Sequence, residues 1–488
     1  MAKDFIVAIE LGSSKVTGIA GQRNLDNSIT VLAIVKEESS SFIRKGVVYN
    51  IDKTAQCIQS IVKKLETQLK TRITKVYAGV GGQSVRSIKN VVTKDLPDGT
   101  IVTDAMIDEL VDINRSMVYP DQEILDFAVQ EYKVDSQYQQ EPVGIQCTRL
   151  EGNYLNMLQR KTFCKNFNKC FDVAGIPTAE MLIAPLALAN VVLTEAERRS
   201  GCALIDIGSD TTTVSVYSKN ILRHLAVVPL GGANITKDIA TLQMEESDAE
   251  KMKLKYASAY TDNSEIDNNL KYSIDPERQV DSRRFIEIVE GRMEEIVENA
   301  WYQIPSEYYD KLLGGIILTG GGANMKNIER AFQNHTHIEK IRVAKTPVLT
   351  INGGGEDIKS KDCMMNTVLG LLAKGDVNCA GTPLDPNGDD LFNGSESDAT
   401  ATIETTPRPA RKLGEVPPGV VLSEAERLQA EKEAKEKQEE EERKKMEEEE
   451  KAKKEAEEAA RIKRENSKWN KLKKGAAKFV KGMFDSEE

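Results

Sequence analysis

Two segments of this chain carry an acidic residue, a glycine and hydroxyl side chains in the same order, a combination suited to holding phosphate groups. The first is IVAIELGSSKVT at residues 6–17, and the second is ALIDIGSDTTTV at residues 203–214. Because a tight glycine turn lies between two β-branched runs in each, we expect β-hairpins whose backbone N–H groups and hydroxyls contact phosphates. The candidate phosphate-binding residues are Gly12, Ser13, Ser14, Lys15, Asp206, Gly208, Ser209, Thr211 and Thr212.

One carboxylate ends the first strand of each predicted hairpin, Glu10 in the first and Asp206 in the second. Two hairpins that face each other could hold the phosphates of a nucleotide from both sides. Their carboxylates could then hold Mg²⁺ through its water molecules, because this ion prefers oxygen ligands. We therefore predict Glu10 and Asp206 as the metal-binding residues, and the sequence identifies no catalytic residue.

A third glycine motif, GGIILTGGGANM at residues 314–325, predicts a strand, a glycine turn and the start of a helix. Such a turn lets a ribose or a flat ring approach the backbone closely. A glycine triplet alone more often marks an ordinary turn, but two acidic hairpins followed by this motif form a specific combination. The candidate binding residues here are Gly320, Gly321, Gly322, Ala323 and Asn324.

Two other nucleotide-binding patterns do not fit the sequence. The P-loop pattern G-x-x-x-x-G-K-[ST] does not occur, which excludes a P-loop NTPase. The segment AGVGGQ at residues 78–83 lacks the G-x-G-x-x-G spacing of a dinucleotide fingerprint, and we expect it to be a strand end that leads into the next segment.

The elements that must position these motifs alternate between β-branched runs and amphipathic stretches from residue 5 to about 374, which predicts an α/β fold. With 488 residues the chain exceeds what one hydrophobic core supports, so we expect two or more core-forming units. No apolar run approaches the roughly 18 residues needed to span a bilayer.

The charge and the cysteine content argue against nucleic-acid-binding, disulfide-stabilised and zinc-binding proteins. The net charge of −11 argues against broad nucleic-acid binding, which needs clustered Lys and Arg. The 7 cysteines form no C-x-x-C pair and indicate a reducing compartment rather than a disulfide framework or a zinc site. His335 and His337 are the close histidine pair, and a metal role for them would need further ligands that the sequence does not show.

At the two hairpins and the TGGGAN motif the chain resembles the actin-like ATPase superfamily, in which these are the phosphate-1, phosphate-2 and adenosine loops. Longer strings resemble the FtsA family of bacterial cell-division proteins: residues 130–153, 176–217 and 227–240. The resemblance implies ATP and Mg²⁺ between two lobes. Glu10 stands where actins and Hsp70 chaperones have Asp, a replacement that FtsA proteins tolerate.

The resemblance also implies further site residues. Gly231, Gly232 and Asn234 would lie near the phosphates with Lys237 behind them, and Glu250 and Lys253 would contact the ribose and adenine. From the residues alone, Glu250 and Lys253 could equally form a surface ion pair at i,i+3. ALANVVLTEAE at 187–197 would be the first connecting helix and CMMNTVLGLL at 363–372 the second.

These observations predict an actin-like two-lobed ATPase fold with an inserted subdomain, a disordered linker, a charged helix and an amphipathic helix. A single solvated spacer helix is favoured over a coiled coil, because Leu428, Met446 and Ile462 are too few to fill heptad positions. The expected domains are 1–83 (first part of lobe 1), 84–162 (inserted subdomain), 163–374 (rest of the core), 375–422 (linker), 423–465 (charged spacer) and 466–488 (amphipathic helix).

The last stretch predicts a membrane-binding helix. At 100° per residue one arc holds apolar side chains and the opposite arc holds lysines, which is typical of a helix lying on an anionic membrane. Docking on this protein's own core or on a partner protein is the alternative. The expected membrane residues are Trp469, Leu472, Phe479, Val480, Met483 and Phe484 on the apolar arc, with Lys471, Lys474, Lys478 and Lys481 opposite.

Together these features predict an ATP-binding protein that assembles with itself at the cytoplasmic face of the cell membrane. The resemblance implies that it anchors the tubulin-like FtsZ ring at the division site and recruits later division proteins, with at most slow ATP hydrolysis. Two alternatives stay open: a small-molecule kinase of the same superfamily, for which no acceptor-site carboxylate is evident, and an Hsp70-like chaperone, for which residues after 375 offer no β-rich peptide-binding domain.

Overall fold

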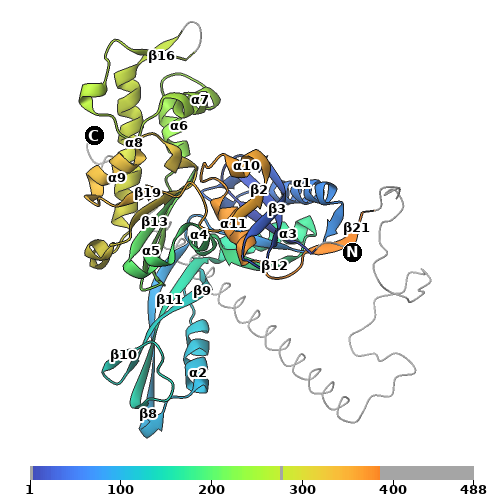
Figure 1. Ribbon diagram of the computed structural model, residues 1–488, viewed down its shortest axis with the longest axis vertical. Coiled ribbons are helices and arrows are strands. Elements are labelled where there is room, and N and C mark those ends of the chain that lie inside the picture. Colours follow the sequence, from blue (N-terminus) through green and yellow to red (C-terminus); the bar gives the residue numbers. More distant parts are fainter. Residues whose placement is uncertain (1–3, 275–277, 385–488) are drawn as a thin grey trace, which may run out of the picture. The chain divides into compact units, whose positions relative to one another are not determined.

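The computed structural model describes residues 4–274 and 278–384 (Figure 1). The predicted charged spacer and amphipathic helix, together with most of the predicted linker, lie outside these residues. Within them the chain forms a mixed α/β structure, as the sequence predicts, and it is built on two large sheets. The described residues include no helix that is long and apolar enough to cross a membrane.

Lobe 1 is built on a six-stranded sheet with the order β12-β7-β1-β2-β3-β20. Its strands are β1 (Ile6–Leu11), β2 (Lys15–Arg23), β3 (Ile29–Glu38), β7 (Val76–Val80), β12 (Thr178–Ile183) and β20 (Ile351–Gly353). Helix α1 (Ile51–Leu69) packs on β2 and β3 because Ile58, Ile61 and Leu65 form a fully buried stripe at helical spacing. Helix α3 (Lys161–Ala174) packs beside α1.

Lobe 2 and the inserted subdomain share a nine-stranded sheet with the order β10-β9-β11-β8-β15-β14-β13-β18-β19. The lobe 2 strands are β13 (Cys202–Ile207), β14 (Thr212–Ser218), β15 (Ile221–Val228), β18 (Gly315–Thr319) and β19 (Ile341–Val343). Helix α8 (Ser282–Tyr302) buries Phe285, Val289, Met293 and Ile296, whose spacing of three and four residues places them on one face.

Several further lobe 2 elements follow β15 in the chain. They are α6 (Gly232–Ala240), α7 (Glu246–Tyr256), α9 (Ile328–Thr336), the 3₁₀ turns η1 (Asn263–Glu265), η2 (Ser306–Lys311) and η3 (Gly321–Asn324), and the short hairpin of β16 (Lys271–Ser273) and β17 (Gln279–Asp281). Among them, α6, α9 and β17 pack on α8. In Figure 1 α6, α7 and α8 lie together at one end of lobe 2.

The inserted subdomain has its own hydrophobic core. It consists of β8 (Arg86–Ile101), α2 (Asp104–Arg115), β9 (Gln122–Val134), β10 (Gln137–Gln139) and β11 (Gln146–Arg160). Leu110 of α2 packs with Leu150 and Tyr154 of β11, and all three are almost completely buried. A short pairing, Ala226 with Arg86, joins its sheet to β15 of lobe 2.

Two helices that connect the lobes cross at very short distance. They are α4 (Ala184–Val192) and α11 (Asn366–Lys374). A Cβ atom built on Gly370 of α11 would lie 2.4 Å from the carbonyl oxygen of Ala187 in α4. Only glycine therefore allows this crossing without a shift of one backbone.

We expect Gly370→Ala to lower the free energy of unfolding by about 1–3 kcal/mol, because the added methyl group overlaps backbone atoms of the facing helix. Gly291 of α8 is the matched control, since a Cβ atom there would meet no atom within 4 Å. Gly291→Ala should raise stability by about 0.5–1 kcal/mol through helix propensity alone. Urea unfolding of both variants tests this, and equal stability of the two would contradict the close crossing.

The predicted first connecting helix is wrong in one respect: residues 187–197 do not form a continuous helix. Helix α4 ends at Val192, and α5 (Glu195–Ser200) begins after Thr194. The Thr194 hydroxyl accepts a hydrogen bond from the Glu197 N–H, and the Glu197 carboxylate accepts one from the Thr194 N–H at 2.8 Å. This reciprocal cap starts a new helix, which the T-E-A-E sequence does encode.

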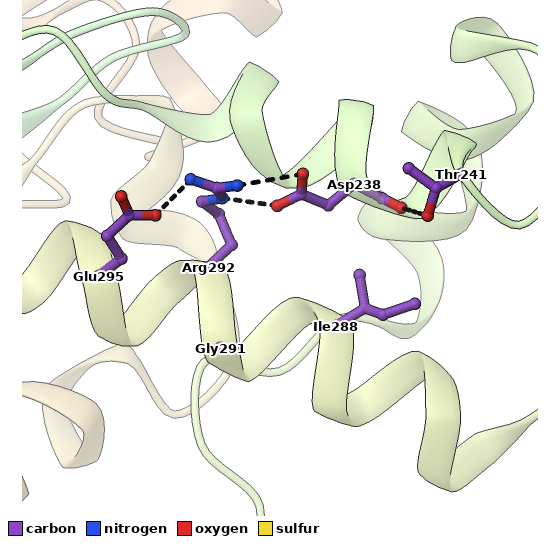
Figure 2. Close-up of a pocket in the computed structure, with 6 residues that line it drawn as sticks. All are labelled: Asp238, Thr241, Ile288, Gly291, Arg292 and Glu295. Atoms are coloured by element: carbon purple, nitrogen blue, oxygen red, sulfur yellow. Dashed lines mark hydrogen bonds and ion pairs between the residues drawn. The ribbon is translucent and has the colours of Figure 1, made fainter.

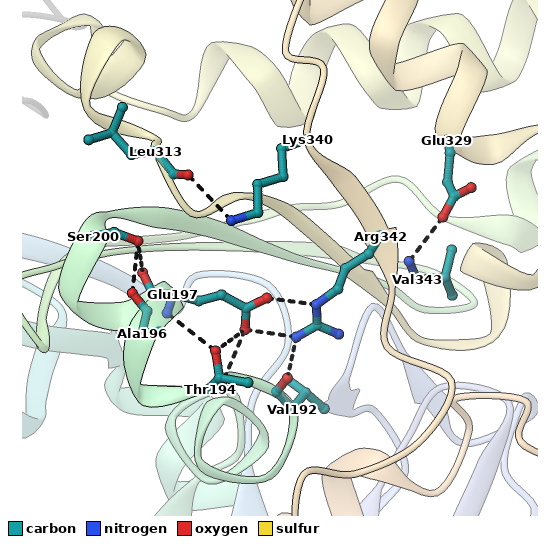
Figure 3. A network of polar contacts seen from close by, with 10 residues as sticks. All are labelled: Val192, Thr194, Ala196, Glu197, Ser200, Leu313, Glu329, Lys340, Arg342 and Val343. Atoms are coloured by element: carbon teal, nitrogen blue, oxygen red, sulfur yellow. Dashed lines mark hydrogen bonds and ion pairs between the residues drawn. The ribbon is translucent and has the colours of Figure 1, made fainter.

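Glu197 also ties this break to the sheet of lobe 2 (Figure 3). The Arg342 guanidinium on β19 donates two hydrogen bonds to its carboxylate, at 2.7 and 2.8 Å, and one to the Val192 carbonyl at 2.8 Å. Burial alone would raise the pKa of Glu197, but the bonds from Arg342 and Thr194 outweigh it and lower the pKa. The C-terminal end of α4 is thus fixed to lobe 2.

The start of the predicted linker also needs correction, because residues 375–384 lie along lobe 1. The Tyr77 hydroxyl accepts hydrogen bonds from the Asp376 and Val377 N–H groups and donates one to the Asp376 carboxylate at 2.7 Å. Residues 380–383 then form β21 (Ala380–Pro383), which pairs with β6 (Thr71–Ile73). The local sequence did not reveal these contacts, since Tyr77, for example, lies 300 residues before Val377 in the chain.

Candidate functional site

The first predicted hairpin is present in the structure. Strands β1 and β2 pair antiparallel, and Glu10 lies opposite Thr17 beside the turn at residues 12–14. Ser39 holds this turn from behind, because its hydroxyl donates to the Gly12 carbonyl at 2.6 Å and its N–H to the Ser14 carbonyl at 3.1 Å. Ser14 and Lys15 are exposed at the tip and are therefore accessible to a ligand.

The second predicted hairpin is present as well. Strands β13 and β14 pair antiparallel, with Asp206 opposite Thr213. The Gly208 N–H donates to the Thr211 carbonyl at 2.8 Å, which closes the turn. The Thr212 hydroxyl donates to the Leu230 carbonyl at 2.9 Å and so links the hairpin to the segment before α6. Thr212 is buried, so it supports the turn from within the lobe.

The N-terminus of α6 packs directly on the second turn. Its Gly232 and Ala233 N–H groups donate to the Gly208 and Ser209 carbonyls at 3.0 and 2.8 Å. Asn234 caps the helix, since its side-chain oxygen accepts from the Gly231 N–H at 3.0 Å. The predicted phosphate site therefore has Gly231, Gly232 and Asn234 beside it. The hydrogen bond from the Gly232 N–H stabilises the second turn, and the one to the Asn234 side chain stabilises the start of α6.

The third motif meets the second hairpin at Asp206. Strand β18 pairs parallel with β13, which places Thr319 opposite Asp206. Gly320 has φ +86° and ψ 171°, a backbone conformation that essentially only glycine adopts. A Cβ atom on Gly320 would lie 2.3 Å from Asp206 Oδ1. The predicted helix start is a 3₁₀ turn, η3, and α9 begins only at Ile328.

The carboxylates of the two hairpins interact electrostatically. Burial and, as the smaller cause, the negative charge of Asp206 together raise the pKa of Glu10 to about 8. Burial raises the pKa of Asp206 to about 6. Glu10 and Asp206 thus form a pair of half-buried carboxylates that repel each other when both are ionised. This donor set suits a hard divalent cation such as Mg²⁺, whose charge would relieve the repulsion.

Glu250 and Lys253 form the ion pair that their spacing suggests, with 2.7 Å between Lys253 Nζ and Glu250 Oε2. Lys253 Nζ also donates to the Gly232 carbonyl at 3.0 Å and to the Thr236 hydroxyl at 2.9 Å. The pair therefore supports the first turn of α6, next to the second hairpin. A direct contact of these side chains with ribose or adenine stays a prediction.

The turn between β4 (Ile43–Arg44) and β5 (Val47–Val48) was not predicted from the sequence. The Gly46 N–H donates to the Ser13 hydroxyl at 2.8 Å, and the Lys45 N–H donates to Asp210 Oδ2 at 2.9 Å. This turn thus contacts both candidate phosphate loops. The adjacent Lys-Gly was an available turn signal, but its two contacts lie 33 and 165 residues away in the chain.

A surface pocket of about 330 Å³ lies between α6 and α8 (Figure 2). The Arg292 guanidinium donates to Asp238 at 2.5 and 3.2 Å and also pairs with Glu295. The bond to Asp238 raises the pKa of Arg292. These contacts join α6, whose first turn supports the second hairpin, to the long helix of lobe 2.

The histidine pair does not act as a unit. His335 Nε2 lies 3.2 Å from Glu298 Oε1, and Glu294 is close to both, whereas His337 does not belong to this group of described residues. Both glutamates are exposed, and such groups commonly occur without an ion. All 7 cysteines are buried free thiols, in agreement with the prediction of no disulfide framework.

Comparisons with known proteins agree with this architecture. The family model "Cell division protein FtsA" matches residues 203–363, and "SHS2 domain inserted in FTSA" matches residues 82–157. The chain is 32% identical over 332 residues to the cell division protein FtsA of Porphyromonas gingivalis, covering 67% of this chain and 69% of that protein. It is also 32% identical over 332 residues to FtsA of Neisseria meningitidis, covering 66% of this chain and 80% of that protein.

Among solved structures, the PilM–PilN type IV pilus biogenesis complex contains a chain of similar fold, with a TM-score of 0.54 at 15% sequence identity. The match covers 76% of this chain and 98% of that chain. At this level of identity the likeness concerns the fold alone.

Proposed function

Because this chain belongs to the FtsA family of cell-division proteins and has an actin-like fold, we propose that it is a membrane-bound, ATP-dependent scaffold of cell division. In this proposal it binds ATP with Mg²⁺ and assembles with copies of itself at the cytoplasmic face of the membrane. It anchors the FtsZ ring there and recruits later division proteins.

The observation that carries the nucleotide part is the convergence of three motifs on Asp206. The first hairpin contributes Glu10, whose pKa responds to the charge of Asp206. The third motif contributes Gly320, which leaves no room for a Cβ atom beside the Asp206 carboxylate. Two acidic hairpins and a glycine turn in this arrangement suit a nucleotide whose phosphates carry a divalent cation. Slow or absent hydrolysis is compatible with a scaffold that responds to nucleotide occupancy.

The membrane part of the proposal rests on the residue pattern at 469–484, which lies outside the described residues. Aromatic and aliphatic side chains at helical spacing would enter the interface, and lysines would face anionic headgroups. Each lysine near such a surface adds about 1 kcal/mol, so binding should be reversible and sensitive to salt.

We expect the intact protein to sediment with anionic vesicles, and Mg-ATP to make sedimentation cooperative in protein concentration. The double variant Phe479→Asp, Phe484→Asp should stay in the supernatant, because two carboxylates would have to enter the membrane interface. The matched double variant Phe479→Leu, Phe484→Leu should still sediment. FtsZ added to the vesicles should sediment only with protein that binds them.

Different failures of this experiment have different meanings. If all three proteins stay in the supernatant, the segment is a protein-docking helix and the membrane part is wrong. If they sediment but Mg-ATP changes nothing, the nucleotide-dependent assembly is wrong. If FtsZ stays in solution while the intact protein sediments, the anchoring role is wrong.

A further inference from the structure

The turn between β4 and β5 holds an unusual position in the molecule. Lys45 has φ +50° and Gly46 has φ +70°, so two consecutive residues adopt the left-handed conformation. This is typical of the tight turn that joins two short antiparallel strands. The conformation directs the N–H groups of both turn residues outward, where each finds a partner on a different phosphate loop.

The first partner lies in lobe 1 and the second in lobe 2. The Gly46 N–H donates to the Ser13 hydroxyl at 2.8 Å, in the first hairpin. The Lys45 N–H donates to the Asp210 carboxylate at 2.9 Å, in the turn of the second hairpin. The second bond therefore crosses from one lobe to the other beside the candidate nucleotide site.

The turn is held rigidly on lobe 1. A Cβ atom on Gly46 would lie 2.5 Å from the Cα atom of Gly82, so the two backbones are in direct contact. The Gln83 N–H donates to the Lys45 carbonyl at 2.8 Å. With its position fixed in this way, the Lys45 N–H can bond Asp210 only when lobe 2 is close.

We propose that the turn at residues 44–47 and the Asp210 carboxylate form a latch between the lobes that retains bound nucleotide and transmits closure to the inserted subdomain. The retention part rests on the proposed nucleotide-binding function. Because the bond exists only while the lobes are close, it stabilises the closed arrangement. A nucleotide held between the two hairpins must break it in order to leave.

The path to the inserted subdomain starts at the same contact. Gly82 and Gln83, which contact the turn, lie three to four residues before the start of β8, the first strand of the subdomain. Its last strand, β11, returns to this place, because the Gln159 side chain donates to the Gly81 carbonyl at 3.0 Å and the Arg160 N–H donates to the Ser84 hydroxyl at 3.3 Å. Both ends of the subdomain are thus fixed within a few residues of the latch.

The test measures release of a fluorescent ATP analogue from the full-length protein with Mg²⁺. We expect Asp210→Ala to release it about three- to tenfold faster, the range that follows from the net contribution of one typical intramolecular hydrogen bond. Asp210→Asn retains an acceptor oxygen without the charge, and its rate should lie between those of Asp210→Ala and the unchanged protein. Asp26→Ala is the matched control, because Asp26 accepts a backbone N–H bond at 2.9 Å within a single lobe 1 turn.

A contrary result would be equal or slower release from both Asp210 variants. Slower release would mean that the Asp210 carboxylate mainly repels the phosphates. Equal release would mean that the hydrogen bond from Lys45 to Asp210 does not slow nucleotide release. Either outcome overturns the latch.

Amide hydrogen exchange of the nucleotide-free protein separates the latch from the proposed function. Peptides covering residues 42–49 and 82–86 should lose protection in Asp210→Ala and retain it in Asp26→Ala. If the unchanged protein binds no nucleotide, the proposed function fails while this exchange result still decides the latch. If protection at both segments is unchanged, the latch and its path to the inserted subdomain are wrong.

Discussion

Gly320→Ala is expected to lower the free energy of unfolding by about 2–5 kcal/mol and to weaken Mg-ATP binding at least about tenfold. The first part of the cost is conformational, since φ +86° with ψ 171° is a region that other residues occupy at about 1–3 kcal/mol. The second part is steric, because the new methyl group would lie 2.3 Å from Asp206 Oδ1 and 2.6 Å from the Ile207 carbonyl oxygen.

The loss of binding follows from the same overlap. The Asp206 carboxylate must move to accommodate the methyl group, and it then no longer faces Glu10 in the arrangement that suits a cation. Chemical denaturation measures the stability, and titration with a fluorescent ATP analogue measures the affinity. Retention of full affinity by a folded Gly320→Ala protein would show that Asp206 does not participate in binding.

Gly321→Ala is the control for the stability measurement. A Cβ atom there would meet only Met364, at 3.8 and 3.9 Å, which is ordinary van der Waals contact. Its backbone is not in the left-handed region, so we expect a change in stability within about 0.5 kcal/mol. A loss as large as that of Gly320→Ala would assign the effect to the general packing of η3.

The sequence predicted the parts of this site that depend on local pattern. Continuous apolar runs that lead into Glu10-Leu-Gly12 and Asp206-Ile-Gly208 define both hairpins, because a strand, a carboxylate and a tight turn are consecutive in the chain. The alternation of β-branched and amphipathic stretches predicted the α/β class, but not the strand order of the sheets. The TGGGAN motif gave the glycine turn, but not its 3₁₀ geometry.

Contacts between segments that are far apart in the chain could not be predicted from the sequence. Nothing in the sequence near Lys45 indicates that its N–H donates a hydrogen bond to Asp210. Likewise, nothing near Asp376 indicates that its N–H donates a hydrogen bond to the Tyr77 hydroxyl. The break at Thr194 is different, because its capping box is present in the sequence, whereas the longer helix was what the family resemblance implied. Long-range contacts and one local capping signal that was not used therefore account for the errors.

The paired carboxylates also predict how this protein depends on pH without a ligand. Folding raises the pKa of Glu10 from 4.5 to about 8 and that of Asp206 from 3.8 to about 6. Between the unfolded and the folded pKa of each group, the folded protein binds more protons than the unfolded chain. Its free energy of unfolding therefore falls as pH rises from about 4 to 8. Glu10→Gln removes the larger contribution and should stabilise the nucleotide-free protein at pH 8 by on the order of 2–4 kcal/mol.

Binding of Mg-ATP should reverse the preference of both carboxylates and release protons. A divalent cation beside Glu10 and Asp206 favours their ionised forms and lowers both pKa values. Near pH 7 Glu10 is mostly protonated in the free protein, so we expect release of about one proton per bound nucleotide and an affinity that rises up to about tenfold per pH unit toward pH 8.

Calorimetric titration at pH 7 in two buffers of different ionisation enthalpy measures the number of protons released. The Glu10→Gln variant should release far fewer, because Asp206, with its pKa of about 6, is already largely ionised at this pH. Equal proton release from the two proteins would place the titrating group elsewhere and would remove Glu10 from the cation site. If the unchanged protein releases about one proton more than Glu10→Gln, the cation site is assigned to Glu10 and Asp206. These carboxylates lie near the end of the first strand of each hairpin.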